Sequence, residues 1–409
     1  MAGQKAKTSK FSRALIHRLL APMKRGSLKM RLPDGEEMSY GTGDEISAQI
    51  QVHDWNFFRK CAFYGDIGFG ESFIDGDWGS KDLTKVIEWM LLNVENHPTL
   101  MGEHRKRKTV NFFKFFNRLG HLLRPNTLRG SRKNITSHYD LSNDFFKLFL
   151  DSTTTYSSAY FKDGAGSLEE AQLAKYNTLC KKLRLKSTDE VLEIGCGWGG
   201  FALYAAQNYG CKMTAITISQ KQYEYTRKAI HDAGLSLRVD IQLKDYRHLH
   251  GRFDKILSIE MIEAVGDKFL KTFFKKLHQL LKPEGILALQ MILSPDHRYE
   301  SFKKNVDWIQ KHIFPGSLLP SMGAIQKNMN RSGTLNLFDF EDITPSYVKT
   351  LLVWQENFNA NLEKVHALGF DDAFIRKWNY YFCYCAGAFN MRNISVAQAV
   401  FSRYNNRQL

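Results

Sequence analysis

The chain lacks long apolar runs and any paired arrangement of cysteines. No apolar segment approaches the roughly 20 residues that a helix needs to cross a bilayer, and the basic N-terminus has no small-residue cleavage site of a signal peptide. Both absences predict a cytoplasmic protein. The six cysteines in 409 residues show neither disulfide nor metal-ligand spacing. We therefore expect reduced thiols and no metal site.

Acidic residues are missing from two long stretches of the chain. Residues 1–33 contain nine Lys or Arg and residues 104–139 contain ten, and neither stretch contains Asp or Glu. The rest of the chain is slightly acidic, so the net charge of +15 comes from two local patches. Such patches predict an anionic partner surface, either phospholipid or nucleic acid.

Bulky apolar residues recur at helical spacing inside both patches, over residues 11–20 and 112–123. Basic amphipathic helices suit a lipid interface, where each cation contributes about 1 kcal/mol. The same stripes could instead pack on the protein itself, and both interpretations stay open. An RNA surface would scatter its aromatic side chains for base stacking. We therefore predict an anionic phospholipid membrane at the inner face as partner, and no nucleic acid.

The chain divides at about residue 130. Residues 27–40 resemble two short strands around a Pro-Asp-Gly turn, residues 65–80 a glycine-punctuated loop, and residues from 81 a helix. These patterns predict a smaller N-terminal α+β domain over 1–130, with a basic linker and lipid contacts.

From residue 170, helical segments alternate with short, almost continuously apolar segments such as 190–194, 212–218, 254–260 and 285–293. This alternation predicts an α/β domain over 131–409 with a mostly parallel, doubly wound sheet. Residues 398–402 fit a last strand.

A glycine-rich loop follows the first strand of this domain and opens a helix, which is the context of a polar cofactor site. Gly195, Gly197 and Gly200 satisfy the dinucleotide fingerprint, but the second strand ends without the acid that NAD requires. An acid two residues before the first glycine, Glu193, makes the loop resemble the first motif of S-adenosylmethionine methyltransferases.

Further segments extend this resemblance over nearly the whole chain. They are "LEIGCGWGG", "TISQKQ", "KDYR", "EMIEAVG", "IFPGSLLPS", "CAGAFNMR", "GDIGFGESFIDGDW", "HYDLSNDFF" and "TYSSAYF". Together they resemble the cyclopropane-fatty-acyl-phospholipid synthase family. The resemblance implies a Rossmann-like class I methyltransferase fold, S-adenosyl-L-methionine as cofactor, and a homodimer as a frequent state. The cofactor contacts that it implies are Tyr156, Ser157, Glu193, Gly195, Cys196, Gly197, Trp198, Gly199, Gly200, Thr217, Ser219, Gln220, Gln222, Asp245 and Tyr246.

The family's reaction, as the resemblance implies it, alkylates a cis double bond in a phospholipid acyl chain. The alkylated chain carries a carbocation, which needs negative or π-rich surroundings without water. A bound bicarbonate then removes a proton and the cyclopropane ring closes. The bicarbonate pocket maps onto Glu263, Tyr347, Gln290, Ser158 and Ile292.

Two of these positions depart from the best-known members of the family, which have Cys at 158 and His at 290. Gln290 can donate an amide hydrogen bond but cannot carry charge, which affects ring closure more than methyl transfer. Cys385 matches a cysteine traditionally assigned to the active site, although a buried cysteine more often fills apolar space.

Three other functions stay open. The cation could lose a different proton after a hydride shift, giving a methyl- or methylene-branched chain. An RNA methyltransferase would use the same cofactor and the basic charge. A lipid-binding protein with a vestigial site is disfavoured by the intact loop and by Glu263 and Tyr347.

Overall fold

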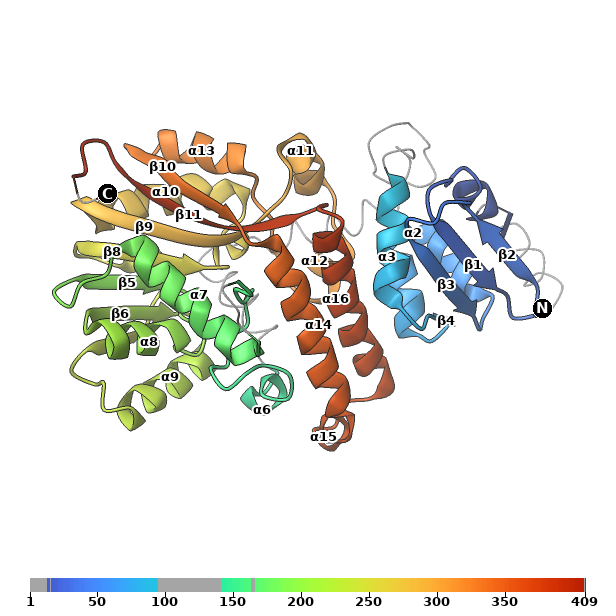
Figure 1. Cartoon of the computed structure of the whole chain (residues 1–409), viewed down its shortest axis with the longest axis horizontal. Coiled ribbons are helices and arrows are strands. Elements are labelled where there is room, and N and C mark those ends of the chain that lie inside the picture. Colours follow the sequence, from blue (N-terminus) through green and yellow to red (C-terminus); the bar gives the residue numbers. More distant parts are fainter. Residues whose placement is uncertain (1–12, 15, 95–140, 163–165, 408) are drawn as a thin grey trace. The chain divides into compact units, whose positions relative to one another are not determined.

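A computed structural model of the chain describes residues 13–14, 16–94, 141–162, 166–407 and 409. The chain forms two compact units (Figure 1). The first comprises Met1–Leu123, Lys304–Ile313 and Trp354–Asn393, and the second comprises Arg124–Lys303, Phe314–Val353 and Ile394–Leu409. The boundary expected at residue 130 lies outside the described residues. The first unit also includes two segments from the C-terminal half, which a contiguous division does not anticipate.

A small mixed sheet forms the N-terminal part of the first unit. The predicted hairpin is confirmed: β1 (Ser27–Arg31) pairs antiparallel with β2 (Glu37–Tyr40). On its other side β1 pairs parallel with β3 (Ser47–Val52), which pairs antiparallel with β4 (Trp78–Gly79). Leu28 and Met30 of β1 are buried on one face of the sheet.

The prediction of a loop over residues 65–80 was wrong for the part up to Ile74, which is helical. Helix α2 runs over Asn56–Ile74 and is interrupted only at Gly65, which has a φ of 60°. The other glycines serve close packing, because a Cβ at Gly70 would lie 2.5 Å from the Trp308 ring. Glycine in this segment therefore marks helix contacts and not a loop.

Helices from both ends of the chain pack within the first unit. Its remaining helices are α3 (Leu83–Val94), α12 (Trp308–His312), α15 (Leu362–Ala367) and α16 (Asp372–Asn390). A Cβ on Gly387 of α16 would lie 2.9 Å from Ile87 of α3, so the two helices touch. Helix α14 (Thr344–Ala360) is shared between the two units.

The first basic amphipathic segment packs partly on the protein. Residues 16–20 are helical, and Ile16 and Leu20 are buried. Arg13 forms an ion pair with Glu36, 2.5 Å away. For these side chains the self-packing alternative is confirmed. The second segment, over 112–123, lies outside the described residues.

The second unit is built on a seven-stranded sheet in the order β10-β11-β9-β8-β5-β6-β7. The five strands from β9 to β7 pair in parallel, and β11 pairs antiparallel with both β9 and β10. This confirms the mostly parallel sheet and the last strand. The strands are β5 (Glu190–Ile194), β6 (Lys212–Thr217), β7 (Val239–Leu243), β8 (Phe253–Ile259), β9 (Leu281–Leu293), β10 (Leu335–Asp342) and β11 (Ser395–Arg403).

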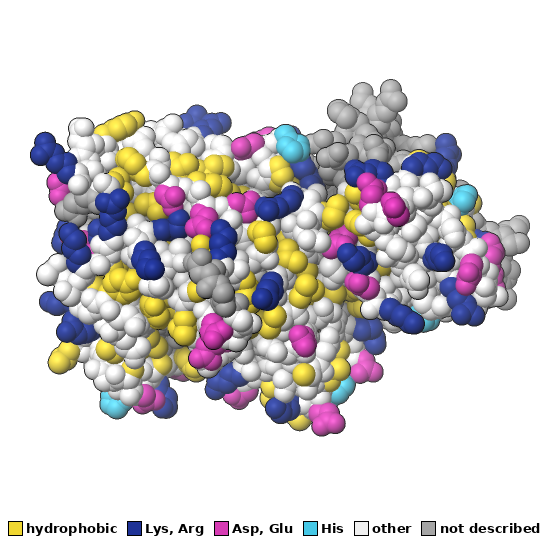
Figure 2. Space-filling model, viewed as in Figure 1, with side chains coloured by type: hydrophobic (Ala, Val, Ile, Leu, Met, Phe, Trp, Pro, Cys, Tyr) yellow, Lys and Arg dark blue, Asp and Glu magenta, His cyan; other side chains and the backbone are white. Residues whose placement is uncertain are grey.

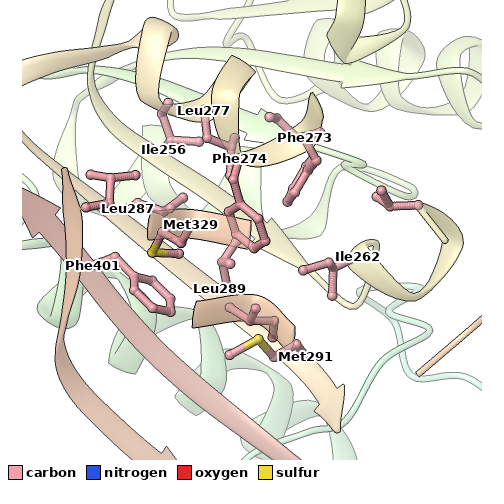
Figure 3. Close-up of a cluster of buried hydrophobic side chains, with 14 of the residues drawn as sticks. Ile256, Ile262, Phe273, Phe274, Leu277, Leu287, Leu289, Met291, Met329 and Phe401 are labelled. Atoms are coloured by element: carbon pink, nitrogen blue, oxygen red, sulfur yellow. The ribbon is translucent and has the colours of Figure 1, made fainter. Parts of the chain in front are cut away.

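Two apolar cores cover the two faces of this sheet. On one face α7 and α8 pack with Val191, Met213 and Ala288. On the other face α10 and α13 pack with Leu287 and neighbouring strand residues, as Figure 3 shows. The helices of this unit are α6 (Asn143–Phe146), α7 (Leu168–Leu183), α8 (Gly200–Tyr209), α9 (Gln220–Asp232), α10 (Leu270–Leu280), α11 (Asp296–Lys304) and α13 (Met322–Asn330), with short 3-10 turns at Tyr246–His248, Ile262–Ala264 and Asp267–Phe269.

The visible surface shows mixed charge. In Figure 2, Lys and Arg side chains are interspersed with Asp and Glu across the coloured residues. Within the part of the chain that the structure covers, every helix is too short or too polar to cross a membrane.

Candidate active site

The glycine loop joins β5 to α8 through three left-handed glycines. Gly195, Gly197 and Gly199 have φ values of 81°, 54° and 87°, a region that side chains other than glycine seldom adopt. The backbone N–H of Gly195 donates to the carbonyl of Ile216 at 3.0 Å, which ties the loop to β6. The loop therefore turns sharply at the carboxyl ends of two adjacent strands.

The glycines of the loop differ in what surrounds them. A Cβ at Gly195 would lie 2.8 Å from Met261 Cγ, and one at Gly199 would lie 2.5 Å from Thr226 Cγ2. Among the described residues, nothing lies within 4 Å of a Cβ placed at Gly197. Protein atoms thus crowd Gly195 and Gly199, whereas the surface at Gly197 is uncovered by the part of the chain that the structure describes. Gly200 opens α8 with its Cα close to the hydroxyl of Tyr176.

An aromatic cluster lies beside the loop. Trp198 donates from Nε1 to Asn143 Oδ1 at 3.0 Å, and its ring lies 5.0 Å from that of Phe146. The ring of Tyr156 lies 5.3 Å from the same phenylalanine. Cys196 is buried, and burial raises the pKa of its thiol well above the usual value. Its side chain is therefore apolar filling, and only its backbone can face a cofactor.

Glu193 lies beneath the loop. Its carboxylate accepts the backbone N–H of Ala202 in the first turn of α8, and burial, partly offset by Lys175, raises its pKa to about 8. The second oxygen, Oε2, is buried without a hydrogen-bond partner among the described residues. The acid that distinguished this motif from an NAD site thus holds the start of the helix and leaves one carboxyl oxygen unsatisfied among the described residues.

Polar side chains at the end of β6 form hydrogen bonds with the start of α9. Thr217 Oγ1 donates to Gln222 Oε1 at 2.8 Å, and Ser219 caps α9 by accepting the backbone N–H of Gln222 at 3.4 Å. Gln220 is exposed and donates to Glu224 at 2.6 Å. Of the two predicted glutamines, Gln222 is buried and bonded to Thr217, whereas Gln220 is exposed; the cofactor contact of either stays a prediction.

Asp245 and Tyr246 follow β7. Although burial acts to raise it, the pKa of Asp245 is lowered because Arg247 donates to its carboxylate at 2.8 and 2.7 Å. Tyr246 turns its ring into the apolar core, edge-on to Phe273 at 5.3 Å. Its side chain is thus occupied by packing, which leaves its backbone for the predicted cofactor contact.

The predicted catalytic residues of the second unit converge at the carboxyl ends of β8 and β9. Gln290 is 1% exposed and donates from Nε2 to Ser158 O at 3.1 Å and to Glu260 Oε1 at 2.8 Å. Its own Oε1 accepts from Gln398 at 3.0 Å. Both N–H groups and the oxygen of this amide are therefore bonded to protein groups.

Glu263 binds the backbone N–H of the residue two positions after Gln290. Its Oε1 accepts from the backbone N–H of Ile292 at 2.5 Å, and Oε2 is buried without a partner in the described part of the chain. Burial, reinforced by the nearby Glu260, raises the pKa of Glu263 to about 8. Burial and the neighbouring charge therefore favour the neutral form of this carboxyl.

Sequence reasoning missed Glu260. The Glu260 carboxylate accepts from the backbone N–H of Ser158 at 2.9 Å, from Gln290 and from the Tyr347 hydroxyl. Its neighbour Met261 contacts Gly195, so the carboxylate cluster adjoins the glycine loop. Its position directly after an apolar strand was the available signal.

Lys175 was missed as well. It is fully buried on α7 and donates to Ser157 Oγ at 2.8 Å. Burial lowers the pKa of its amine to about 7, opposed by the charges of Glu260, Asp151 and Glu193. A lysine at i+4 from Ala171, within an otherwise apolar helical stripe, could have revealed it.

The donors expected to hold bicarbonate do not fit that ion. Ser158 N–H, Gln290 Nε2 and Tyr347 all point to the Glu260 carboxylate, and the Ile292 N–H is held by Glu263. A second anion would have to displace a protein carboxylate from each of them. This set of donors therefore serves the protein's own acids.

Cys385 lies on α16 in the first unit, whereas the other catalytic candidates lie in the second. Burial raises the pKa of its thiol, with Asp307 and Cys383 adding to the rise. A protonated thiol is a poor nucleophile, and its role stays a prediction.

A family model described as mycolic acid cyclopropane synthetase matches residues 126–399. Two characterised relatives align over most of the chain. A tuberculostearic acid methyltransferase of Mycobacterium tuberculosis is 35% identical over 380 residues, 91% of this chain and 87% of that protein. The cyclopropane-fatty-acyl-phospholipid synthase of Escherichia coli K12 is 37% identical over 360 residues, 87% and 88% of the two chains.

One solved structure is similar to this chain in both sequence and fold. A mycolic acid cyclopropane synthase complexed with SAH and CTAB is 30% identical, with a TM-score of 0.62. The match covers 66% of this chain and 98% of that one. It supports the class I methyltransferase fold with its seven-stranded sheet.

Proposed function

This chain belongs to the mycolic acid cyclopropane synthetase family, and on that premise we propose that it alkylates the cis double bond of unsaturated phospholipid acyl chains and closes a cyclopropane ring. The family comprises S-adenosylmethionine-dependent enzymes that methylate or cyclopropanate acyl chains. One observation carries the proposal. A carboxylate cluster adjoins, through Met261, the glycine loop with its uncovered Gly197.

S-adenosylmethionine, when bound, supplies an electrophilic methyl group. Gly197 would leave room for it, Glu193 Oε2 offers a buried acceptor, and Gln222 would contact its ribose. The alkene is a weak nucleophile, so the protein must stabilise the cation that forms on the acyl chain. Glu260 supplies a negative charge for that purpose, and the rings of Trp198 and Tyr156 line the loop.

A second product is favoured by the altered base site. The alkylated cation can shift a hydride and lose a different proton, giving a branched chain. Gln290 in place of the expected histidine, together with a relative named as a tuberculostearic acid methyltransferase, supports this alternative. An RNA methyltransferase finds no support in the family match.

We also propose that the enzyme acts as a peripheral protein at the inner membrane face, since its substrates are lipids. The basic segments before residue 33 and over 104–139 would supply the attraction to anionic head groups.

Lipid analysis tests the function. The chain is expressed in a bacterial host without its own synthase, and the acyl chains are measured by mass spectrometry and gas chromatography. We expect monounsaturated chains to gain the mass of one methylene and to elute as cyclopropane species. A gain in mass with only branched products selects the second candidate. Unchanged acyl chains, with the protein present in the cells, would refute both.

A further inference from the structure

The end of β8 places a protein carboxylate where the family resemblance predicts a bound ion. Glu260 Oε1 lies 2.9 Å from the Ser158 backbone nitrogen and 2.8 Å from Gln290 Nε2, and Tyr347 completes the set. These are three of the donors that the resemblance assigns to bicarbonate. Hydrogen bonds of this kind stabilise a carboxylate in its charged form.

The backbone at Glu260 is strained in a way that aims this side chain. Its φ of 47° lies in the left-handed region, which is unusual for glutamate. The backbone N–H donates to the carbonyl of Gln290 at 2.7 Å, which anchors the residue to β9. Strain that neighbouring contacts maintain is typical of functional positions.

Resting on the proposed function, we infer that the Glu260 carboxylate takes the place of bicarbonate as the base of the reaction. A C–H bond of the transferred methyl group breaks, and its electron pair closes the ring onto the cationic carbon. The proton moves to the carboxylate, which later returns it to solvent. The enzyme then requires no bicarbonate.

The charges around Glu260 agree with this role. Burial raises the pKa of Glu260, while Gln290, Lys175, Ser158 and Tyr347 oppose the rise. Among the described residues Glu263 receives one hydrogen bond, and burial beside Glu260 favours its neutral form, so ionisation of both acids together is disfavoured. The negative charge of the pair therefore resides on Glu260.

The test uses the purified full-length chain with vesicles of an unsaturated phosphatidylglycerol and S-adenosylmethionine. Product is measured in carbon-dioxide-free buffer and with added bicarbonate. We expect the unaltered chain to be equally active in both. Glu260→Gly should lose about 100-fold or more in rate without bicarbonate and recover about tenfold or more with it, because glycine frees the three donors. Glu260→Gln should lose as much and recover nothing, because its amide fills the same space.

Two further measurements separate this inference from the proposed function and from misfolding. Carbon-13 NMR with labelled bicarbonate should detect bound ion in Glu260→Gly and none in the unaltered chain, whichever product the enzyme makes. Arg184→Gly is the matched control, since Arg184 also has a left-handed φ, 54°, at the end of α7. It should keep full activity without bicarbonate dependence. Bicarbonate binding or dependence in the unaltered chain, or full activity of Glu260→Gln, would overturn the inference.

Discussion

Two glycines of the β5–α8 loop should separate folding from cofactor binding. Gly199→Ala forces a side chain into a left-handed backbone, which costs about 1–2 kcal/mol. Its Cβ would also lie 2.5 Å from Thr226 Cγ2, and overpacking of that kind costs about 1–3 kcal/mol. Gly197→Ala should incur only the backbone cost, because no described residue lies within 4 Å of its Cβ.

The packing part of this cost can be isolated at Thr226. Thr226→Ser removes the Cγ2 methyl group and keeps the hydroxyl that donates to the Gly197 carbonyl at 3.4 Å. Added to Gly199→Ala, it should recover about 1–3 kcal/mol, which is the overpacking contribution. Urea unfolding of the unaltered chain, Gly199→Ala, Thr226→Ser and the double variant measures this recovery in the free energy of unfolding. If the double variant is as unstable as Gly199→Ala alone, the close contact does not set the cost.

Cofactor affinity should respond in the opposite order. A methyl group at Gly197 enters the uncovered surface of the loop, so we expect S-adenosylhomocysteine to bind at least about tenfold more weakly, a loss of about 1.4 kcal/mol. Gly199→Ala, in which protein atoms already cover the site, should lose less. Isothermal titration with S-adenosylhomocysteine provides the comparison. Unchanged affinity in Gly197→Ala would refute the assignment of this surface to the cofactor.

Two predictions concern titration of the buried groups. Lys175→Met removes the cation that opposes the raised pKa of Glu193 and Glu260, so the pH–rate profile should move to higher pH by a measurable step; an unchanged profile would contradict the coupling. Glu263 has a folded pKa of about 8 against an ordinary value of 4.5, so its stabilising effect is complete below pH 4.5 and is lost as the pH rises to 8. In Glu263→Gln, the decrease in urea midpoint between pH 5 and pH 8 should be smaller than in the unaltered chain, and an equal decrease would show that this acid is not protonated when folded.

The sequence predicted the second unit well because its signals are local. Buried parallel strands are continuously apolar, and their alternation with helices identified β5, β6, β8 and β9 within a few residues. The edge strand β10 was missed, since it is not a continuously apolar run and its register with β11 shifts between Leu337 and Asp339. In the first unit, Gly68 and Gly70 were interpreted as loop residues, although they allow close packing of α2.

The site was only partly predictable because its partners are distant in sequence. The glycine loop and Glu193 form a contiguous motif, so spacing alone revealed them. Glu260, in contrast, takes its hydrogen bonds from Ser158 and Gln290, which are 102 and 30 residues away. A single glutamate carries no sign of donors that only the fold assembles. The same is true of Gln290. Its amide predicted a hydrogen-bond donor, but the sequence did not show that Glu260 would be the acceptor.

Glu260 and Glu263, the two acids that follow β8, lie in environments that favour different protonation states. Within the described ranges, Glu260 receives hydrogen bonds from three groups, whereas one oxygen of Glu263 receives a single bond and the other receives none. Since donors favour the ionised form and burial without donors favours the neutral one, their environments push the two pKa values apart. A carbocation formed nearby would therefore meet one fixed negative charge, held by Gln290 against β9. A base fixed in this way can reach only the protons that the acyl chain presents to it, so the placement of the chain against Glu260 determines whether a ring or a branch forms.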